Sequence, residues 1–215
     1  MSSSDRARVR KPASERRAEI LAAAASIALS EGLERITVRS VASRLNVRPG
    51  LVSHYFPAVD TLIVEAFMVA ANEGQFDTQT TLESPAERLA AIFEGLRDAK
   101  AQAQYRLWSS ARNFSRTSAA MAMALEELEE AGRSRMTDLI EQGARTGDFA
   151  GVDATAACVR IYMAIDGYGV YANNPMPFSH DAYDYFVSDV AEWALGLAPG
   201  SLRTHTSHER TFKPN

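Results

Sequence analysis

Polar side chains that could bind a nucleic acid gather around Pro49. The Arg48 guanidinium can pair with a guanine edge through two hydrogen bonds, and the hydroxyls of Ser53 and Tyr55 suit phosphate or base contacts. Gly50 has no side chain, which permits its backbone to approach DNA closely. The predicted DNA-facing residues, which include the start of the preceding helix, are Thr37, Arg48, Pro49, Gly50, Ser53, His54 and Tyr55.

Two short helices must position these groups. Apolar residues recur with helical spacing over 38–45 after Thr37, a favourable N-cap, and Asn46 tolerates the left-handed conformation that ends a helix. Pro49 suits the first position of a second helix, whose Val52 would face inward. Two helices joined in this way form a helix-turn-helix, whose second helix fits a major groove about 12 Å wide. The alternative is a surface turn between two packing helices.

His54 and Thr37 have different expected roles within this segment. His54 can donate to a phosphate, which we favour, or it can pack against the neighbouring rings of Tyr55 and Phe56. Thr37 would offer its hydroxyl and the N–H groups of a helix N-terminus to a phosphate.

The rest of the chain also shows helical spacing. A first helix is expected from an N-cap at Ser14 to Gly32, and a fourth helix after a cap at Asp60. Further helices are expected from Ser84, over 105–115, 118–146 and 154–172, and from about His180 to Leu197. Because no stretch alternates polar and apolar residues for long, the sequence predicts an all-α fold without strands.

The predicted organisation has two helical domains. Residues 14–58 are expected to form an N-terminal three-helix helix-turn-helix domain, and residues 59–199 a larger C-terminal helical domain for ligand binding and dimerisation. Residues 1–13 are predicted to be a flexible basic arm, and residues 200–215 a disordered tail.

Charge is distributed unevenly along the 215 residues. The total is −4, but residues 1–60 hold ten Lys/Arg and six Asp/Glu, whereas residues 61–215 hold thirteen and twenty-one. A net +4 segment on a net −8 body indicates a basic surface that attracts polyanions. The apolar run 20–29 is too short to cross a bilayer, and no apolar region follows the first twelve residues, so a cytoplasmic location without a membrane partner is predicted.

The stretch from Ile36 to Phe56, ITVRSVASRLNVRPGLVSHYF, closely resembles the DNA-binding domain of the TetR family of bacterial transcriptional regulators. Its VSHYF ending is similar to the branch that includes the choline-responsive repressors of betaine synthesis. The resemblance implies a repressor that binds a palindromic operator in double-stranded DNA as a homodimer and is released by a small-molecule effector. Val59 stands where many members have a phosphate-contacting lysine, and the small Ala28 and Leu33 stand where aromatic residues are common.

An enzyme is not predicted. The chain has no glycine-rich phosphate loop, nucleophile elbow or HExxH motif, so no catalytic residue, cofactor or metal site is assigned. The single cysteine, Cys158, lies in an apolar helix and is expected to be a packing residue. His205, His208 and Glu209 are interpreted as solvated tail residues. The alternative function is a helical protein-interaction or ligand-binding bundle without DNA binding.

The family resemblance also implies an effector cavity in the C-terminal domain. The side chains predicted to line it, of which Arg112 and Asp166 are the inward-facing charges, are Phe93, Tyr105, Trp108, Arg112, Met121, Tyr162 and Asp166. Ordinary core packing is the alternative for each aromatic residue. A small, largely apolar effector is expected, and a quaternary ammonium ion held by aromatic faces is a less favoured option.

Apolar stripes on the last two predicted helices indicate a dimer surface. A four-helix interface is expected from Ile161, Ile165, Tyr168, Tyr183, Phe186, Val187, Val190, Ala194 and Leu197. Burial of the stripe within the monomer is the alternative. A dimer would present two recognition helices about 34–36 Å apart, or a multiple of this, to the halves of a palindrome.

Overall fold

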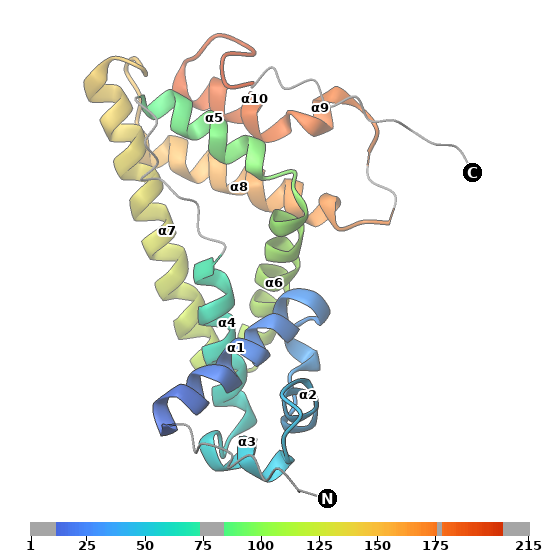
Figure 1. Cartoon of the computed structure of the whole chain (residues 1–215). Helices are drawn as coiled ribbons and strands as arrows, with labels where there is room; N and C mark the ends of the chain where they lie inside the picture. Colours follow the sequence, from blue (N-terminus) through green and yellow to red (C-terminus); the bar gives the residue numbers. More distant parts are fainter. Residues whose placement is uncertain (1–11, 74–83, 176–177, 204–215) are drawn as a thin grey trace, which may run out of the picture. The chain divides into compact units, whose positions relative to one another are not determined.

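The computed structural model describes residues 12–73, 84–175 and 178–203, and every regular element within these ranges is helical. The predicted all-α class is therefore confirmed for the described part of the chain. The elements are α1 (Ala13–Glu31), the 3₁₀ turn η1 (Leu33–Arg35), α2 (Val38–Arg44), α3 (Pro49–Tyr55), α4 (Val59–Glu73), α5 (Pro85–Gly95), α6 (Ala99–Ser115), α7 (Ala119–Thr146), α8 (Ala154–Ala172), α9 (Asp181–Asp184) and α10 (Phe186–Leu195) (Figure 1).

The chain forms two compact units. Residues 1–73 and 107–125 belong to the first unit, and residues 74–106 and 126–215 to the second, so α6 and α7 contribute to both. The first unit includes α4, which packs on α1, although the predicted domain boundary placed residue 59 onward in the C-terminal domain. The predicted arm, apart from residues 12 and 13, lies outside the described residues.

The core of the first unit joins α1 to the short helices that follow it. Ile20 and Ile27 of α1, Val52 of α3 and Leu62 of α4 are all buried. Ala28 and Leu33 are buried as well, so the two small substitutions relative to the family pattern lie in this core. The buried Phe67 ring of α4 meets the edge of Trp108 from α6, with 5.4 Å between the ring centroids.

Two predicted helix starts in the first unit are wrong by two residues. α1 begins at Ala13 after Pro12, not after Ser14, because Pro12 has an extended backbone and its carbonyl accepts from the Arg16 N–H. α4 begins at Val59, which places the Asp60 carboxylate in the first turn, where it favours the helix dipole. Gly32 ends α1 with a positive φ of 104°, but its ψ of 158° is extended and not left-handed helical.

In the second unit, α5 has the predicted cap and α6 is longer than predicted. The Ser84 hydroxyl accepts the Glu87 N–H, and the Glu87 carboxylate accepts the Ser84 N–H. α6 begins at Ala99, not at residue 105, because the Asp98 carboxylate accepts the Ala101 N–H at 2.7 Å. Alanine, lysine and glutamine fill the added residues 99–104, so large apolar residues with helical spacing are absent from this stretch.

The predicted helix over 180–197 is two helices. α9 and α10 are separated at Tyr185, and the left-handed Gly196 ends α10 at Leu195, before the predicted end at Leu197. The sequence predicts a disordered tail from residue 200, but residues 200–203 pack on α10. The buried Glu192 carboxylate accepts the N–H groups of Gly200 and Leu202, and Leu202 is itself buried. The predicted tail beyond Arg203 lies outside the described residues.

No single helix in the described ranges is long and apolar enough to span a membrane. Taken together, α3 and the 59–72 segment of α4 have the length and apolar composition of a span, but the two helices are bent by 79° at the break between them.

Close packing in the second unit requires a glycine at position 143. A Cβ added to Gly143 would lie 2.1 Å from a ring carbon of the buried Phe149. Gly143→Ala is therefore expected to destabilise the protein by about 1–3 kcal/mol, measured by urea unfolding. Gly95→Ala is the matched control, since its added Cβ would meet nothing within 4 Å. Equal free energies of unfolding for the two variants would contradict this packing.

Candidate nucleic-acid interface

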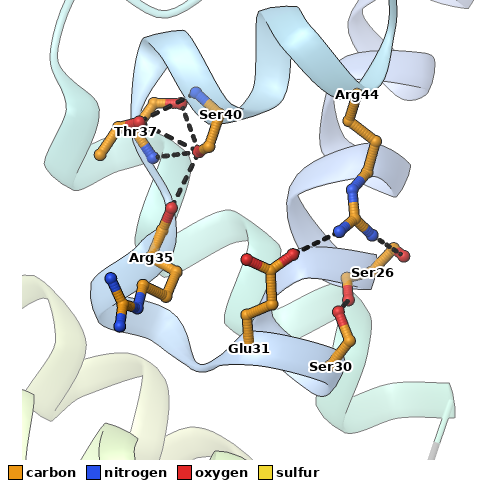
Figure 2. Close-up of polar contacts among 7 residues, drawn as sticks. All are labelled: Ser26, Ser30, Glu31, Arg35, Thr37, Ser40 and Arg44. Atoms are coloured by element: carbon orange, nitrogen blue, oxygen red, sulfur yellow. Dashed lines mark hydrogen bonds and ion pairs between the residues drawn. The ribbon is translucent and has the colours of Figure 1, made fainter.

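Thr37 and Ser40 cap the start of α2 reciprocally. The Ser40 N–H donates to Thr37 Oγ1 at 3.0 Å, and the Thr37 N–H donates to Ser40 Oγ at 2.9 Å (Figure 2). The Ser40 hydroxyl also donates to the carbonyl of Arg35 at 2.8 Å, which ties the helix start to η1. The predicted cap at Thr37 is thus confirmed, and its partner at the third helical position was not predicted.

The turn between α2 and α3 has the backbone that the sequence predicts. Asn46 has a φ of 52°, the one positive φ outside glycine among the described residues, and its N–H bonds to the Ser43 carbonyl. Arg48 is extended, with φ −74° and ψ 140°, and Pro49 is the first residue of α3. These conformations reverse the chain within a short loop and start the second helix at the expected residue.

α3 buries one side and exposes the predicted DNA-facing side. Val52 and the C-cap residue Phe56 are buried in the first unit. The predicted residues Thr37, Arg48, Pro49, Gly50, Ser53 and His54 are exposed, and Tyr55 is half-buried. The structure therefore places all seven along the start of α2 and the outer side of α3.

His54 and Gly50 have informative surroundings. The exposed His54 ring meets the edge of the Tyr55 ring, with 5.3 Å between centroids and 83° between planes, so it both packs on Tyr55 and remains accessible. A Cβ added to Gly50 would meet nothing within 4 Å, so packing inside the protein does not require a glycine there.

Arg44 is a basic residue of this unit that faces α1. Its guanidinium donates to Ser26 Oγ at 2.7 Å and forms an ion pair with Glu31, and the Ser30 hydroxyl in turn donates to the Ser26 carbonyl (Figure 2). This network fixes the end of α2 against the second half of α1. The sequence reasoning missed it because the partners are far apart in the chain and no local pattern links them.

The predicted effector-site residues are divided between the two units. Trp108, Arg112 and Met121 belong to the first unit, where Met121 is buried and the Arg112 guanidinium lies 6.0 Å from the Trp108 ring centroid. Phe93, Tyr105, Tyr162 and Asp166 belong to the second unit. Arg112 and Asp166, predicted to face inward, are half-buried.

The tyrosines of the second unit form an aromatic cluster. The Tyr105 hydroxyl donates to the Leu96 carbonyl at 3.1 Å, and the Tyr105 and Tyr168 rings meet edge to face with centroids 6.0 Å apart. Tyr168 in turn stacks on Tyr183 at 4.9 Å. Burial raises the pKa of Tyr105 far above its usual range and that of Tyr162 to about 12, so both hydroxyls stay protonated at neutral pH.

Four of the nine residues of the predicted dimer stripe are buried within the second unit, which favours burial within the monomer for these four. Ile161, Ile165, Tyr168 and Val187 are buried, and only Phe186 is exposed. The remaining members, all half-buried, are Tyr183, Val190, Ala194 and Leu197. α8 and α10 pack on each other through the stripe, and this contact accounts for its apolar character.

Besides Tyr171, whose ring lies against that of Phe178, five large apolar side chains are exposed on the same two helices, and Phe186 among them also belongs to the stripe. On α8 these are Val159, Met163 and Val170, and on α10 they are Phe186 and Trp193, of which Trp193 is 68 % exposed. The Arg160 guanidinium lies 4.8 Å from the Trp193 ring centroid and links the two helices at this surface. We call these five apolar residues the α8/α10 face. Cys158 beside it is buried, as predicted, and burial raises the pKa of its thiol.

Comparison with solved structures supports the fold. A transcriptional regulator from Saccharomonospora viridis in complex with choline is 21 % identical, with a TM-score of 0.72 over 83 % of this chain and 96 % of that one. A TetR-family regulator from Rhodococcus sp. is also 21 % identical, with a TM-score of 0.67 over 85 % and 99 %. The fatty acid degradation regulator FadR from Bacillus halodurans is 17 % identical, with a TM-score of 0.62 over 87 % and 97 %.

Family models cover most of the described chain, and both describe regulators rather than enzymes. Residues 20–66 match the bacterial regulatory proteins of the tetR family, and residues 85–196, more than half of the chain, match the C-terminal part of BetI-type transcriptional repressors. No curated protein matches the chain. With its helix-turn-helix and its helical C-terminal part, this chain belongs to the TetR family of transcriptional regulators.

Proposed function

We propose that the protein is a ligand-responsive repressor that binds a palindromic operator as a homodimer. The observation that carries this proposal is the two-sided character of α3. Val52 and Phe56 anchor one side in the core, while the opposite side presents Arg48, Ser53 and His54 on a helix that begins at an extended, proline-led turn. A major groove admits such a helix and offers acceptors to these donors.

Phosphate contacts are assigned to the start of α2. The Thr37 hydroxyl accepts the Ser40 N–H, so its own proton can point to Ser40 Oγ or to a phosphate. Helix geometry leaves the N–H groups of Val38 and Arg39 without an acceptor inside α2. These groups would fix the register of the protein on DNA, and Arg48 would read a base.

We assign the dimer surface to the α8/α10 face, which shares only Phe186 with the stripe predicted from the sequence. Five large apolar side chains exposed on two packed helices form a surface that is expected to be buried against a partner. The same face of a second copy is the matching partner, because a two-fold axis brings identical patches together and sets two recognition helices at a fixed spacing.

The effector is assigned to the C-terminal part of the chain. The S. viridis neighbour binds choline, and aromatic faces hold quaternary ammonium ions through cation–π attraction. The tyrosine cluster around Tyr168 and the Asp166 carboxylate offer this chemistry in the second unit. The aliphatic side chains around them would suit a small apolar molecule as the effector instead. A thermal-shift screen with both classes of compound tests the assignment, and a true effector must also release DNA.

Gly50→Ala tests close approach of α3 to DNA. The variant is expected to fold with unchanged or slightly higher stability, because the added methyl group meets nothing inside the protein. Its affinity for operator DNA is expected to fall about tenfold or more per half-site, because the methyl group would separate the helix from the groove. Fluorescence anisotropy measures the affinity, and thermal unfolding is the control for stability. An unaltered affinity would show that α3 does not approach DNA at this residue.

A titration against DNA from upstream of the protein's own gene, at several salt concentrations, tests the function itself. If each protomer neutralises about five phosphates, the logarithm of the association constant of the dimer falls with log salt at a slope near −9. The helical-bundle alternative predicts no binding even in dilute buffer. Transcription from the bound promoter, measured with and without the protein, distinguishes a repressor, which lowers it, from an activator, which raises it.

A further inference from the structure

Arg17 of α1 contacts two other helices of the first unit. Its Nη2 lies 2.6 Å and 2.7 Å from the two carboxylate oxygens of Glu65 on α4. The same guanidinium lies 4.7 Å from the ring centroid of Phe56, the residue that caps the C-terminus of α3. One side chain therefore joins α1, α4 and the end of the helix that carries the predicted base-reading groups.

Two buried residues anchor the end of α3 in the core. α3 is seven residues long, and Val52 is its buried residue, followed by the buried C-cap Phe56, whose N–H donates to the Val52 carbonyl. A helix with two core anchors can rotate or tilt when one of them shifts. Because His54 and Tyr55 directly precede Phe56, any movement of this ring moves the groups proposed to meet DNA.

The charge of Arg17 does not make it a phosphate ligand. Its Nη2 is paired with the Glu65 carboxylate and one face of the guanidinium lies over the Phe56 ring, so the group is directed to partners inside the unit. The pair is half-exposed, so its contribution to global stability is small. Its geometric effect is larger, because base reading requires a helix held to within about 0.5 Å, whereas phosphate contacts tolerate more movement.

We propose that Arg17 is a positioning residue for sequence recognition, which sets the pose of α3 without contacting DNA. This inference rests on the proposed function. It identifies a determinant of specificity on α1, outside the helix-turn-helix itself, and makes Glu65 its partner in that role.

Glu65→Gln separates positioning from electrostatics. Loss of this carboxylate makes the DNA-binding unit more positive, so charge alone predicts tighter binding to every duplex. Loss of the Arg17 restraint predicts a lower preference for the specific duplex. Arg17→Ala removes the restraint from the other side. Arg17→Lys keeps the charge but has no planar group that can stack on the Phe56 ring in the same way.

The experiment uses the full chain and two duplexes of equal length and composition. One duplex is selected by the wild-type protein from a random-sequence pool, and the other is its scrambled version. Arg17→Ala and Glu65→Gln are expected to lower the ratio of the two affinities about tenfold, and Arg17→Lys by less. Arg16→Ala is the matched control, since Arg16 is the neighbouring arginine and its ion pair with Glu19 lies within α1. Its affinity ratio is expected to stay at the wild-type value.

Three results would overturn the proposal. An unchanged affinity ratio in Arg17→Ala would show that the contact does not position α3. An equal loss on both duplexes, with a salt slope smaller by about one for each protomer, would make Arg17 a phosphate ligand. Tighter binding of Glu65→Gln to both duplexes at an unchanged ratio would leave only electrostatics. A wild-type protein that selects no duplex would instead contradict the proposed function.

Discussion

Trp193→Glu is expected to convert the protein into a monomer that no longer binds its operator. Trp193 is 68 % exposed on α10, and the Arg160 guanidinium lies 4.8 Å from its ring centroid. The substitution therefore removes little packing from the monomer. At a two-fold interface the change occurs twice. A buried tryptophan at the centre of an interface contributes about 2–4 kcal/mol, and two added carboxylates would face each other or an apolar surface.

Light scattering coupled to size-exclusion chromatography measures the mass, and an operator titration measures the consequence. Met123→Glu is the matched control, because Met123 of α7 is 71 % exposed and lies in the first unit. It is expected to remain dimeric and to keep its affinity. A dimeric Trp193→Glu variant would remove the α8/α10 face from the proposed assembly, and an operator-binding monomer would contradict the need for two copies.

Arg48→Ala is expected to lower affinity by about 1–3 kcal/mol per half-site and to relax base preference at one position of each half. Arg48 is exposed, and its backbone is extended immediately before the first turn of α3. Arg48→Lys keeps the charge and loses the two-donor geometry, so it is expected to lose base preference as well.

Thr37→Ala provides the contrast to Arg48→Ala. It removes the hydroxyl that accepts the Ser40 N–H, so it is expected to lower the free energy of unfolding by about 1 kcal/mol. It is also expected to weaken binding to all DNA sequences alike. Selection from duplexes randomised at each half-site position distinguishes the two behaviours. Equal losses on every sequence for Arg48→Ala would make Arg48 a phosphate contact.

Local chemistry made the helix-turn-helix predictable from the sequence. The Thr37 cap, the positive φ of Asn46 and the proline start of α3 each follow from one or two neighbouring residues. The same applies to the cap at Ser84. Helix starts were missed where the deciding residue was a less obvious one, such as Pro12 before α1 or Asp98 before an alanine-rich turn of α6.

The dimer stripe shows what a pattern cannot decide. α8 carries apolar residues on more than one side, with Ile161 and Ile165 buried and Val159 and Met163 exposed. Helical spacing identifies each set but not which of them packs on α10, because that choice depends on the partner helix. The contacts of Arg17 with Glu65 and Phe56 also join residues far apart in the chain and follow no local rule.

Dimethyl sulfate protection of operator DNA tests the placement of α3 most directly, because guanine N7 lies in the major groove. With α3 in the major groove, the bound protein is expected to protect guanines in two clusters, with centres one helical turn or a multiple of it apart, about 34–36 Å for one turn. Arg48→Ala is expected to remove protection at one guanine of each cluster. Binding that leaves every guanine N7 reactive would contradict a recognition helix in the major groove.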